Sequence, residues 1–176
     1  MREKAIIHMD SKYLLDLYSK LESMGIKIWI DGGWAVDALL GKQTRPHEDL
    51  DIAIERNKLL ELRSYLIAHG YRDVEREKNK MWDLVMNDGN GHEIEVHTFD
   101  LDDNGMVLKE DYWDGYSVDS LNGVGYIEGY KVRCVSVEQL IKTHRNDRRE
   151  LKEKDYKDIR ALCDKFKIEY PEGLRI

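Results

Sequence analysis

The chain has 176 residues, 41% of them hydrophobic and 36% charged, a balance typical of a globular protein rather than a disordered one. The net charge of −7 argues against broad nucleic-acid binding, and no apolar run approaches the roughly 20 residues of a membrane-spanning helix. Two cysteines, Cys134 and Cys163, provide no disulfide framework and no metal-ligand spacing, so we expect a reduced, cytoplasmic protein. From the charge and the lack of a long apolar run, we expect no nucleic-acid or membrane partner.

The first half of the chain alternates predicted helices and strands. Residues 11–24 predict a helix, because leucine and tyrosine side chains recur there at helical spacing and Gly25 can close it. The elements expected next are a strand over 26–30, a turn at 31–33, a helix over 34–40, a strand over 50–54 and a helix over 57–69 capped by Asn57.

The second half begins with a predicted hairpin over 81–99, whose tip carries the turn-forming residues 88–91 (DGNG). A shorter hairpin is expected around Glu128-Gly129, followed by a helix capped by Ser136 and a last helix that reaches Phe166. These elements indicate an α/β (α+β) protein: a core over residues 1–99 and a smaller half over 100–176, made of a hairpin and helices.

Two aspartates on the second predicted strand are the strongest candidates for chemistry. Leu50 and Ile52 are expected to face the core, so Asp49 and Asp51 project together from the opposite face. Carboxylates held this close repel each other unless a cation neutralises them, and their oxygen atoms suit Mg²⁺. Such a pair holds two ions in enzymes that transfer phosphoryl or nucleotidyl groups, although the pair alone also fits two solvated acids on an exposed face.

The Gly32-Gly33 pair strengthens the phosphate-transfer hypothesis. The pair follows a predicted strand and precedes a helix, where backbone N–H groups and the positive helix end can bind a triphosphate. Arg45 and His47, in the loop before the aspartates, are further candidates for phosphate contacts. Gly-Gly alone is an ordinary turn, and its position shortly before the aspartates is what makes the pattern specific.

A third carboxylate is needed to accept the proton of an attacking hydroxyl and to complete the metal ligands. Ile94 and Val96 are expected to face the core, so Glu93, Glu95 and His97 share the other face of their strand. We select Glu95, because apolar residues flank it on both sides and tie it to a position in the sheet.

Two blocks of the chain, residues 30–37 (IDGGWAVD) and 41–51 (GKQTRPHEDLD), resemble those of antibiotic nucleotidyltransferases. These are the lincosamide and aminoglycoside 2''-type enzymes of the polymerase-beta-type superfamily. The similarity continues through Glu95-Val96-His97, residues 132–136 (VRCVS), and His144 with Asp155 and Asp158.

The resemblance implies a nucleotidyltransferase fold, with a mixed, twisted sheet flanked by helices. It also implies transfer of AMP from ATP, or of another nucleotide, to a hydroxyl of a small-molecule antibiotic, with release of pyrophosphate. Asp49 and Asp51 would hold Mg²⁺, two ions in all, with Glu95 as third ligand and base, and Gly32 and Gly33 would bind the nucleotide with Arg45 and His47. A monomer or a homodimer is expected.

The acceptor is predicted from an acidic segment that directly follows the Glu95 strand. Seven acidic residues and one basic residue lie between Asp100 and Asp119. Acidic groups attract polycations, and aromatic rings stack on sugars or cations, so a cationic, aminoglycoside-like acceptor is favoured. The candidate acceptor-binding residues are Asp100, Asp102, Tyr112 and Trp113.

Several alternatives stay open at this point. A lincosamide could be the acceptor, or the enzyme could modify RNA or protein as toxin-type members of the superfamily do. In other classes, the same carboxylates could serve a two-metal phosphate-ester hydrolase, or the fold could be a non-catalytic binding module.

Overall fold

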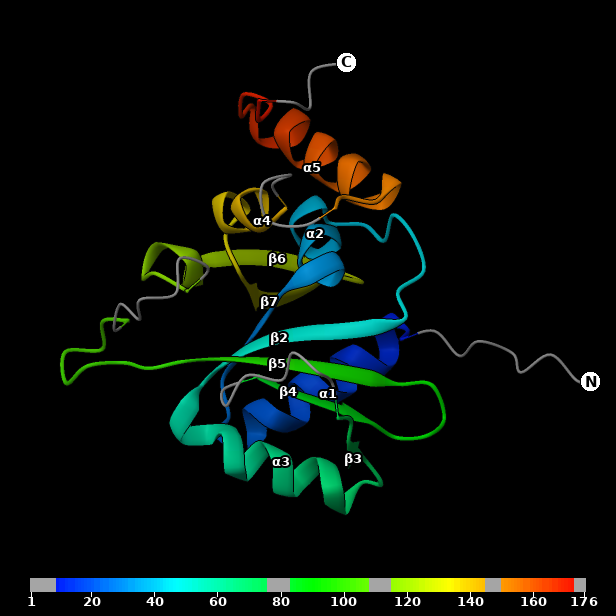
Figure 1. Ribbon diagram of the computed structural model, residues 1–176, viewed down its shortest axis with the longest axis vertical. Coiled ribbons are helices and arrows are strands. Elements are labelled where there is room, and N and C mark those ends of the chain that lie inside the picture. The colour runs from blue at the N-terminus through cyan, green and yellow to red at the C-terminus, as the bar shows by residue number, and fades with distance from the viewer. Residues whose placement is uncertain (1–8, 76–82, 108–114, 145–149, 173–176) are drawn as a thin grey trace, which may run out of the picture.

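We describe a computed structural model of the chain over residues 9–75, 83–107, 115–144 and 150–172. Its centre is a seven-stranded sheet in the order β3-β4-β5-β2-β1-β7-β6 (Figure 1). The strands are β1 (Ile28–Ile30), β2 (Asp49–Glu55), β3 (Arg72–Asp73), β4 (Asp83–Asn87), β5 (Glu93–Phe99), β6 (Gly123–Ile127) and β7 (Tyr130–Cys134). Because β2 and β5 are parallel while β1 and β2 are antiparallel, the predicted mixed sheet is confirmed.

Helices cover both faces of the sheet (Figure 1). On one side lie α1 (Ser11–Ser23) and α3 (Leu59–Ala68); on the other lie α2 (Gly32–Leu40), α4 (Val137–Thr143) and α5 (Glu153–Phe166). The helices on the first side bury leucines such as Leu21 and Leu66 in a core that also contains Ile52 and Ile54 of β2. Alternation along β2 therefore sends its apolar residues into this core and leaves Asp49 and Asp51 on the face that carries α2.

The start of α2 differs from the sequence prediction of a turn followed by a helix at Trp34. The helix begins at Gly32, because the Asp31 carboxylate accepts the Gly32 N–H at 2.8 Å and the Asp31 carbonyl accepts the Ala35 N–H. The two glycines are thus the first residues of the helix, not a separate turn.

Two other boundaries differ for similar local reasons. β1 is shorter than predicted, because the Ile26 N–H bonds back to the Leu21 carbonyl and closes α1. α3 follows a 3₁₀ turn, Arg56–Lys58, and the Asn57 side chain bonds to Glu55 instead of capping the helix. The predicted Ser136 cap is confirmed, since its hydroxyl accepts the Gln139 N–H.

The second half of the chain extends the same sheet rather than standing apart from it. β7 pairs in parallel with β1, and β6 forms the outer edge. The proposed division of the chain at residue 99 into a catalytic and an acceptor part stays a prediction. Within the described ranges, no helix is both long and apolar enough to cross a membrane.

Candidate active site

Parallel pairing of β2 with β5 brings the predicted carboxylates together. In this register Asp51 lies beside Glu95 and Asp49 beside Glu93, with all four side chains partly exposed. Leu50 and Ile52 are almost completely buried on the other face, as the alternation predicted. The strand that supplies the aspartates and the strand that supplies the third carboxylate are therefore direct neighbours.

His97 joins Asp51 and Glu95 in a cluster that the sequence did not identify. One ligand atom from each of these three side chains lies within 4.8 Å of the other two. The His97 Nε2 atom is 3.8 Å from Asp51 Oδ1 and 3.9 Å from Glu95 Oε1. Alternation placed His97 on the same face as Glu95, but only the pairing of the strands shows that it also reaches Asp51.

Asp49 lies at the edge of this cluster. Its partial burial raises the pKa of its carboxyl group, and the negative charge of Asp51 raises it further. A cation bound beside Asp49 would act in the opposite direction and lower this pKa, because it favours the charged carboxylate.

Gly32 is required by the position of Asp51. A Cβ atom at residue 32 would lie 2.0 Å from Asp51 Oδ2, and the backbone there has φ of +57°, which disfavours other residues. The Asp31 N–H also donates to the Asp51 carbonyl at 2.8 Å. The start of α2 is thus fitted directly against the second aspartate.

The Gly32 N–H is used within the protein, since it donates to Asp31. The next N–H groups, of Gly33 and Trp34, lie in the first turn of α2, where a helix supplies no acceptor. They are the first-turn backbone donors of α2.

Gly33 lies against Arg45 and His47. A Cβ atom at residue 33 would lie 2.5 Å from Arg45 Nη2 and 2.7 Å from the His47 ring. Arg45 Nη2 donates to Asp158 of α5 at 3.0 Å, and His47 Nε2 lies 2.5 Å from Asp37 Oδ2. The two predicted phosphate-binding side chains therefore belong to a network that links α2, the loop before β2, and α5.

The donors in this network determine the tautomer of His47. Arg45 Nη1 lies 3.0 Å from His47 Nδ1, and a guanidinium only donates, so Nδ1 must be the acceptor. The ring proton is therefore on Nε2, where it bonds to Asp37. Both ring nitrogens of the buried His47 have protein partners, whereas the Arg45 side chain keeps 26% of its surface exposed.

The family model described as aminoglycoside-2''-adenylyltransferase matches residues 13–162. The chain belongs to this family. Membership confirms the predicted resemblance and the predicted enzyme class, a nucleotidyltransferase.

Relatives of this adenylyltransferase family member include a lincosamide resistance protein of Staphylococcus haemolyticus, 29% identical over 92% of this chain and 98% of the relative. A 2''-aminoglycoside nucleotidyltransferase of Escherichia coli is 37% identical over 54 residues, which cover 31% of this chain and 30% of that one.

Solved structures give the same fold. A crystal structure of the lincosamide antibiotic adenylyltransferase LnuA with lincomycin bound has a TM-score of 0.77 and 25% identity, covering 93% of this chain and all of that one. ANT(2'')-Ia in complex with adenylyl-2''-tobramycin has a TM-score of 0.73 and 21% identity, covering 89% and 88% of the two chains. The predicted nucleotidyltransferase fold is thereby confirmed.

The predicted acceptor-binding residues of this family member have local partners where the structure describes them. Asp100 forms a 2.9 Å ion pair with Arg56, and Asp102 Oδ1 accepts the N–H groups of Asn104 and Met106, both at 2.8 Å. Tyr112 and Trp113 lie outside the described residues. Asp100 and Asp102 thus contribute to the conformation of the loop after β5.

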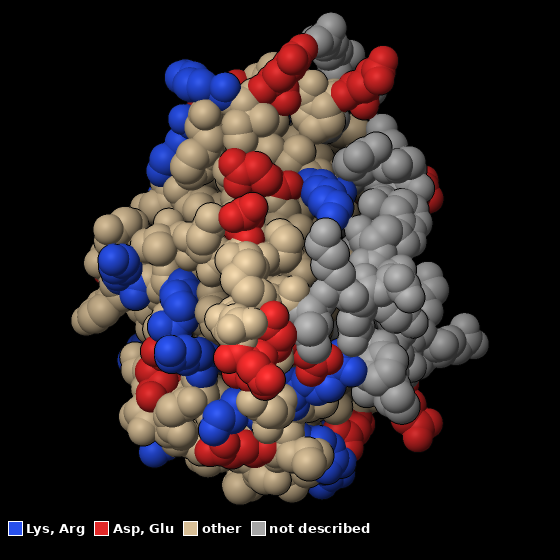
Figure 2. Space-filling model, turned by 90° about the vertical axis from the view of Figure 1, so that its left-hand side faces the viewer, with Lys and Arg blue, Asp and Glu red and all other residues tan. Residues whose placement is uncertain are grey.

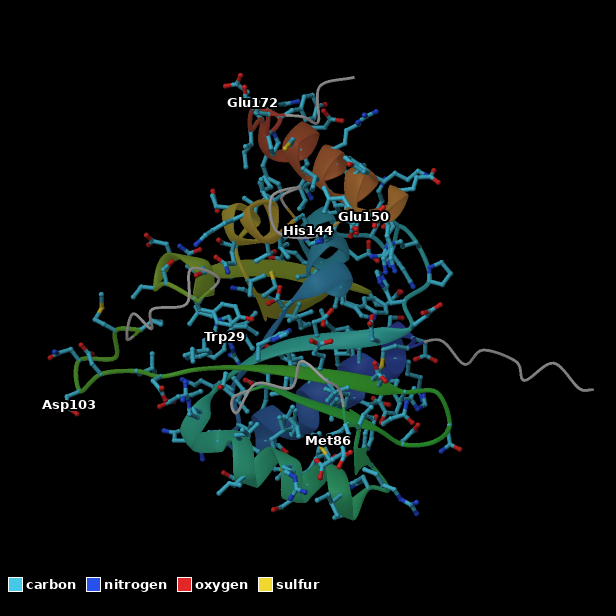
Figure 3. The ribbon with its side chains drawn as sticks, in the orientation of Figure 1. Trp29, Met86, Asp103, His144, Glu150 and Glu172 are labelled. Atoms are coloured by element: carbon cyan, nitrogen blue, oxygen red, sulfur yellow. The ribbon has the colours of Figure 1, made fainter. Side chains whose placement is uncertain are left out.

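This loop extends beyond the sheet, with Asp103 at its far end (Figure 3). Among the described residues visible on the face of the molecule that carries the loop, acidic side chains form several groups with basic ones between them (Figure 2). Tyr116, further along the same acidic segment, donates to Asp31 Oδ2 at 2.6 Å and so contacts the cap of α2.

Proposed function

We propose that this enzyme transfers AMP from ATP to a hydroxyl of a small-molecule antibiotic and releases pyrophosphate. The observation that carries the proposal is the convergence of Asp51, Glu95 and the start of α2, with Gly32 fitted against Asp51. Family membership supports the same reaction.

The side chains of Asp51, Glu95 and His97 together fit a divalent cation. Their ligand atoms lie within 4.8 Å of one another, and two of them are carboxylates with the oxygen atoms that Mg²⁺ prefers. Asp49 and Asp51, with Glu95, would hold the metal, and we propose two Mg²⁺ ions, as in other nucleotidyl transfers. Bound there, divalent cations neutralise charge on the triphosphate and acidify the acceptor hydroxyl.

The residues of the chain then have separate tasks. Glu95 accepts the proton of the acceptor hydroxyl, whose oxygen bonds to the α-phosphorus of ATP while the bond to the pyrophosphate oxygen breaks. The first-turn N–H groups of Gly33 and Trp34 and the positive end of α2 stabilise the triphosphate. Arg45, whose side chain is partly exposed and lies beside Gly33, is proposed to contact the phosphates as well.

Two acceptor classes compete. The acidic segment after β5 and the family description favour an aminoglycoside, which carries several ammonium groups. The second candidate is a lincosamide, favoured because the lincosamide resistance protein and LnuA match nearly the whole length of this chain.

The test is pyrophosphate release from ATP with kanamycin or lincomycin as acceptor, with and without Mg²⁺. We expect Asp49→Asn and Asp51→Asn to abolish release, because each removes a metal ligand. For Glu95→Gln we expect nucleotide binding to persist while kcat falls by about 10²–10⁴-fold, the usual contribution of a general base.

Glu55→Gln is the matched control, because Glu55 lies on β2 on the same face as the aspartates but bonds to Asn57 instead of joining the cluster. Its kinetics should match those of the wild-type enzyme. Undiminished pyrophosphate release by Asp51→Asn would refute the proposed metal site.

A further inference from the structure

His97 occupies a position from which it can reach the proposed metal. It lies on β5 two residues after Glu95, and its partner position on β2 is Ala53. Alanine has the smallest side chain with a Cβ, so the imidazole has room to lean across β2 toward Asp51. Its side chain is 28% exposed, similar to the 22% of Asp51 and the 30% of Glu95.

The two distances from His97 to the carboxylates suit ligands of one ion. Two atoms bonded to the same ion at about 2.1 Å each are at most about 4.2 Å apart. His97 Nε2 lies 3.8 Å from Asp51 Oδ1 and 3.9 Å from Glu95 Oε1, both within this limit. Both separations are longer than a hydrogen bond and lie in the range of an ion pair between a carboxylate and an imidazole.

We propose that His97 Nε2 is a ligand of the metal and makes this site prefer Mn²⁺ to Mg²⁺. The inference rests on the proposed function for the location of the metal, and it adds a nitrogen ligand to the expected carboxylates. Mg²⁺ favours oxygen ligands, whereas an imidazole nitrogen favours first-row transition ions, among which Mn²⁺ also accepts carboxylates readily. A site with two carboxylates and one imidazole is therefore expected to bind Mn²⁺ more tightly than Mg²⁺.

The experiment measures metal binding by the full chain without nucleotide or antibiotic. We expect Mn²⁺, followed by the loss of its free EPR signal, to bind wild-type protein at least about tenfold more tightly than Mg²⁺, measured by competition. His97→Asn should weaken Mn²⁺ binding by about 10–100-fold, the range seen for changes around metal ligands, while Mg²⁺ affinity stays within about threefold.

Pulsed EPR of the bound Mn²⁺ provides a direct signature. Wild-type protein should show the coupling of a directly bonded imidazole nitrogen, and His97→Asn should lack it. His69→Asn is the matched control, because His69 is an exposed histidine at the end of α3 that bonds to the Tyr65 carbonyl. This control should retain both the affinity and the coupling, which excludes binding by surface histidines.

Absence of nitrogen coupling in wild-type protein would overturn the proposal without reference to any variant. Equal loss of Mn²⁺ and Mg²⁺ affinity in His97→Asn would also overturn it, since that result indicates a packing role. These outcomes are separate from the proposed function. If no antibiotic accepts AMP but the nitrogen coupling is present, only the proposed function fails. If an antibiotic accepts AMP but the nitrogen coupling is absent, only the proposal that His97 is a metal ligand fails.

Discussion

At the scale of single residues, the site depends on Gly32 and Gly33, which have no Cβ atom. Asp51 occupies the space where a Gly32 side chain would lie, and Arg45 and His47 occupy the space beside Gly33. The glycines thus serve two purposes, because they also begin the helix whose N–H groups are proposed to bind the triphosphate. A side chain at residue 32 would displace a proposed metal ligand directly.

Gly32→Ala tests this requirement against Gly41→Ala, a matched control at the other end of α2. Both glycines have positive φ, +57° and +74°, but a Cβ atom at residue 41 meets nothing within 4 Å. Gly41→Ala should lose about 1–2 kcal/mol of unfolding free energy, the cost of the left-handed conformation, and Gly32→Ala should lose at least as much, because its Cβ atom also meets Asp51. Only Gly32→Ala should also lose kcat, by about 10²-fold or more, because a displacement of about 1 Å at a reacting centre has that effect.

Chemical denaturation gives the stability of both variants, and pyrophosphate release gives their activity. If Gly41→Ala loses as much activity as Gly32→Ala, backbone strain in α2 and not the position of Asp51 would explain the loss.

At the scale of secondary-structure elements, α5 acts as a support for the start of α2 and the loop before β2. Asp158 of α5 accepts from Arg45, which in turn bonds to His47 and lies against Gly33. Near the other end of the helix, Lys165 donates to the carbonyls of Leu39 and Leu40, at the C-terminal end of α2 where a cation is favoured. One contact therefore ties α5 to the loop before β2, and the other ties it directly to α2.

Asp158→Ala should destabilise the protein and impair the site together. Asp158 forms a 3.0 Å ion pair with Arg45, and its side chain is only 6% exposed. Removal of the carboxylate leaves the Arg45 guanidinium without this charged partner, and little solvent is present to replace it. We expect a loss of about 1.5–3 kcal/mol, the contribution of a hydrogen bond between charged groups, together with a higher KM for ATP.

The control lies in the same helix, where Lys157 and Glu153 form an ion pair with side chains that are 73% and 82% exposed. Because solvent screens this pair, Glu153→Ala should leave both the melting temperature and the KM for ATP nearly unchanged. A wild-type melting temperature and a wild-type KM for ATP in Asp158→Ala would show that the contact with Arg45 has no supporting role.

At the scale of the whole molecule, charge is distributed unevenly along the chain. Most of the net charge of −7 comes from the segment between Asp100 and Asp119, which follows β5 and returns to the cap of α2 through Tyr116. Arg56 neutralises Asp100, so the other acidic residues of the segment, including Asp102, must supply most of any field toward an acceptor.

Salt titration of the acceptor KM tests whether this field selects the substrate. The Debye length falls from about 10 Å at 0.1 M salt to about 3 Å at 1 M, so binding of a polycation weakens as salt rises. We expect the KM for kanamycin to rise several-fold over this range, and the KM for lincomycin, which carries at most one charge, to change little. A kanamycin KM that does not respond to salt would contradict an acidic acceptor site and favour the lincosamide alternative.

The sequence by itself determined those structural features that depend only on residues close together along the chain. Alternation of Leu50 and Ile52 with Asp49 and Asp51 assigned opposite faces of one strand, and the Ser136 signal assigned a helix start, because both are local properties of the backbone. The motif at residues 30–51 was sufficient to indicate the family, since it concentrates the glycines and aspartates of the site in one block.

Only the tertiary structure decided which residues from distant parts of the chain meet. The pairing of β2 with β5 gave His97 its contact with Asp51, and the packing of α5 brought Asp158 to Arg45. Local periodicity carries no information about which strand or helix becomes a neighbour, because that choice depends on burial summed over the whole core. The contacts of His97 and Asp158, on which their proposed roles rest, therefore became visible only when the sheet and its helices were assembled.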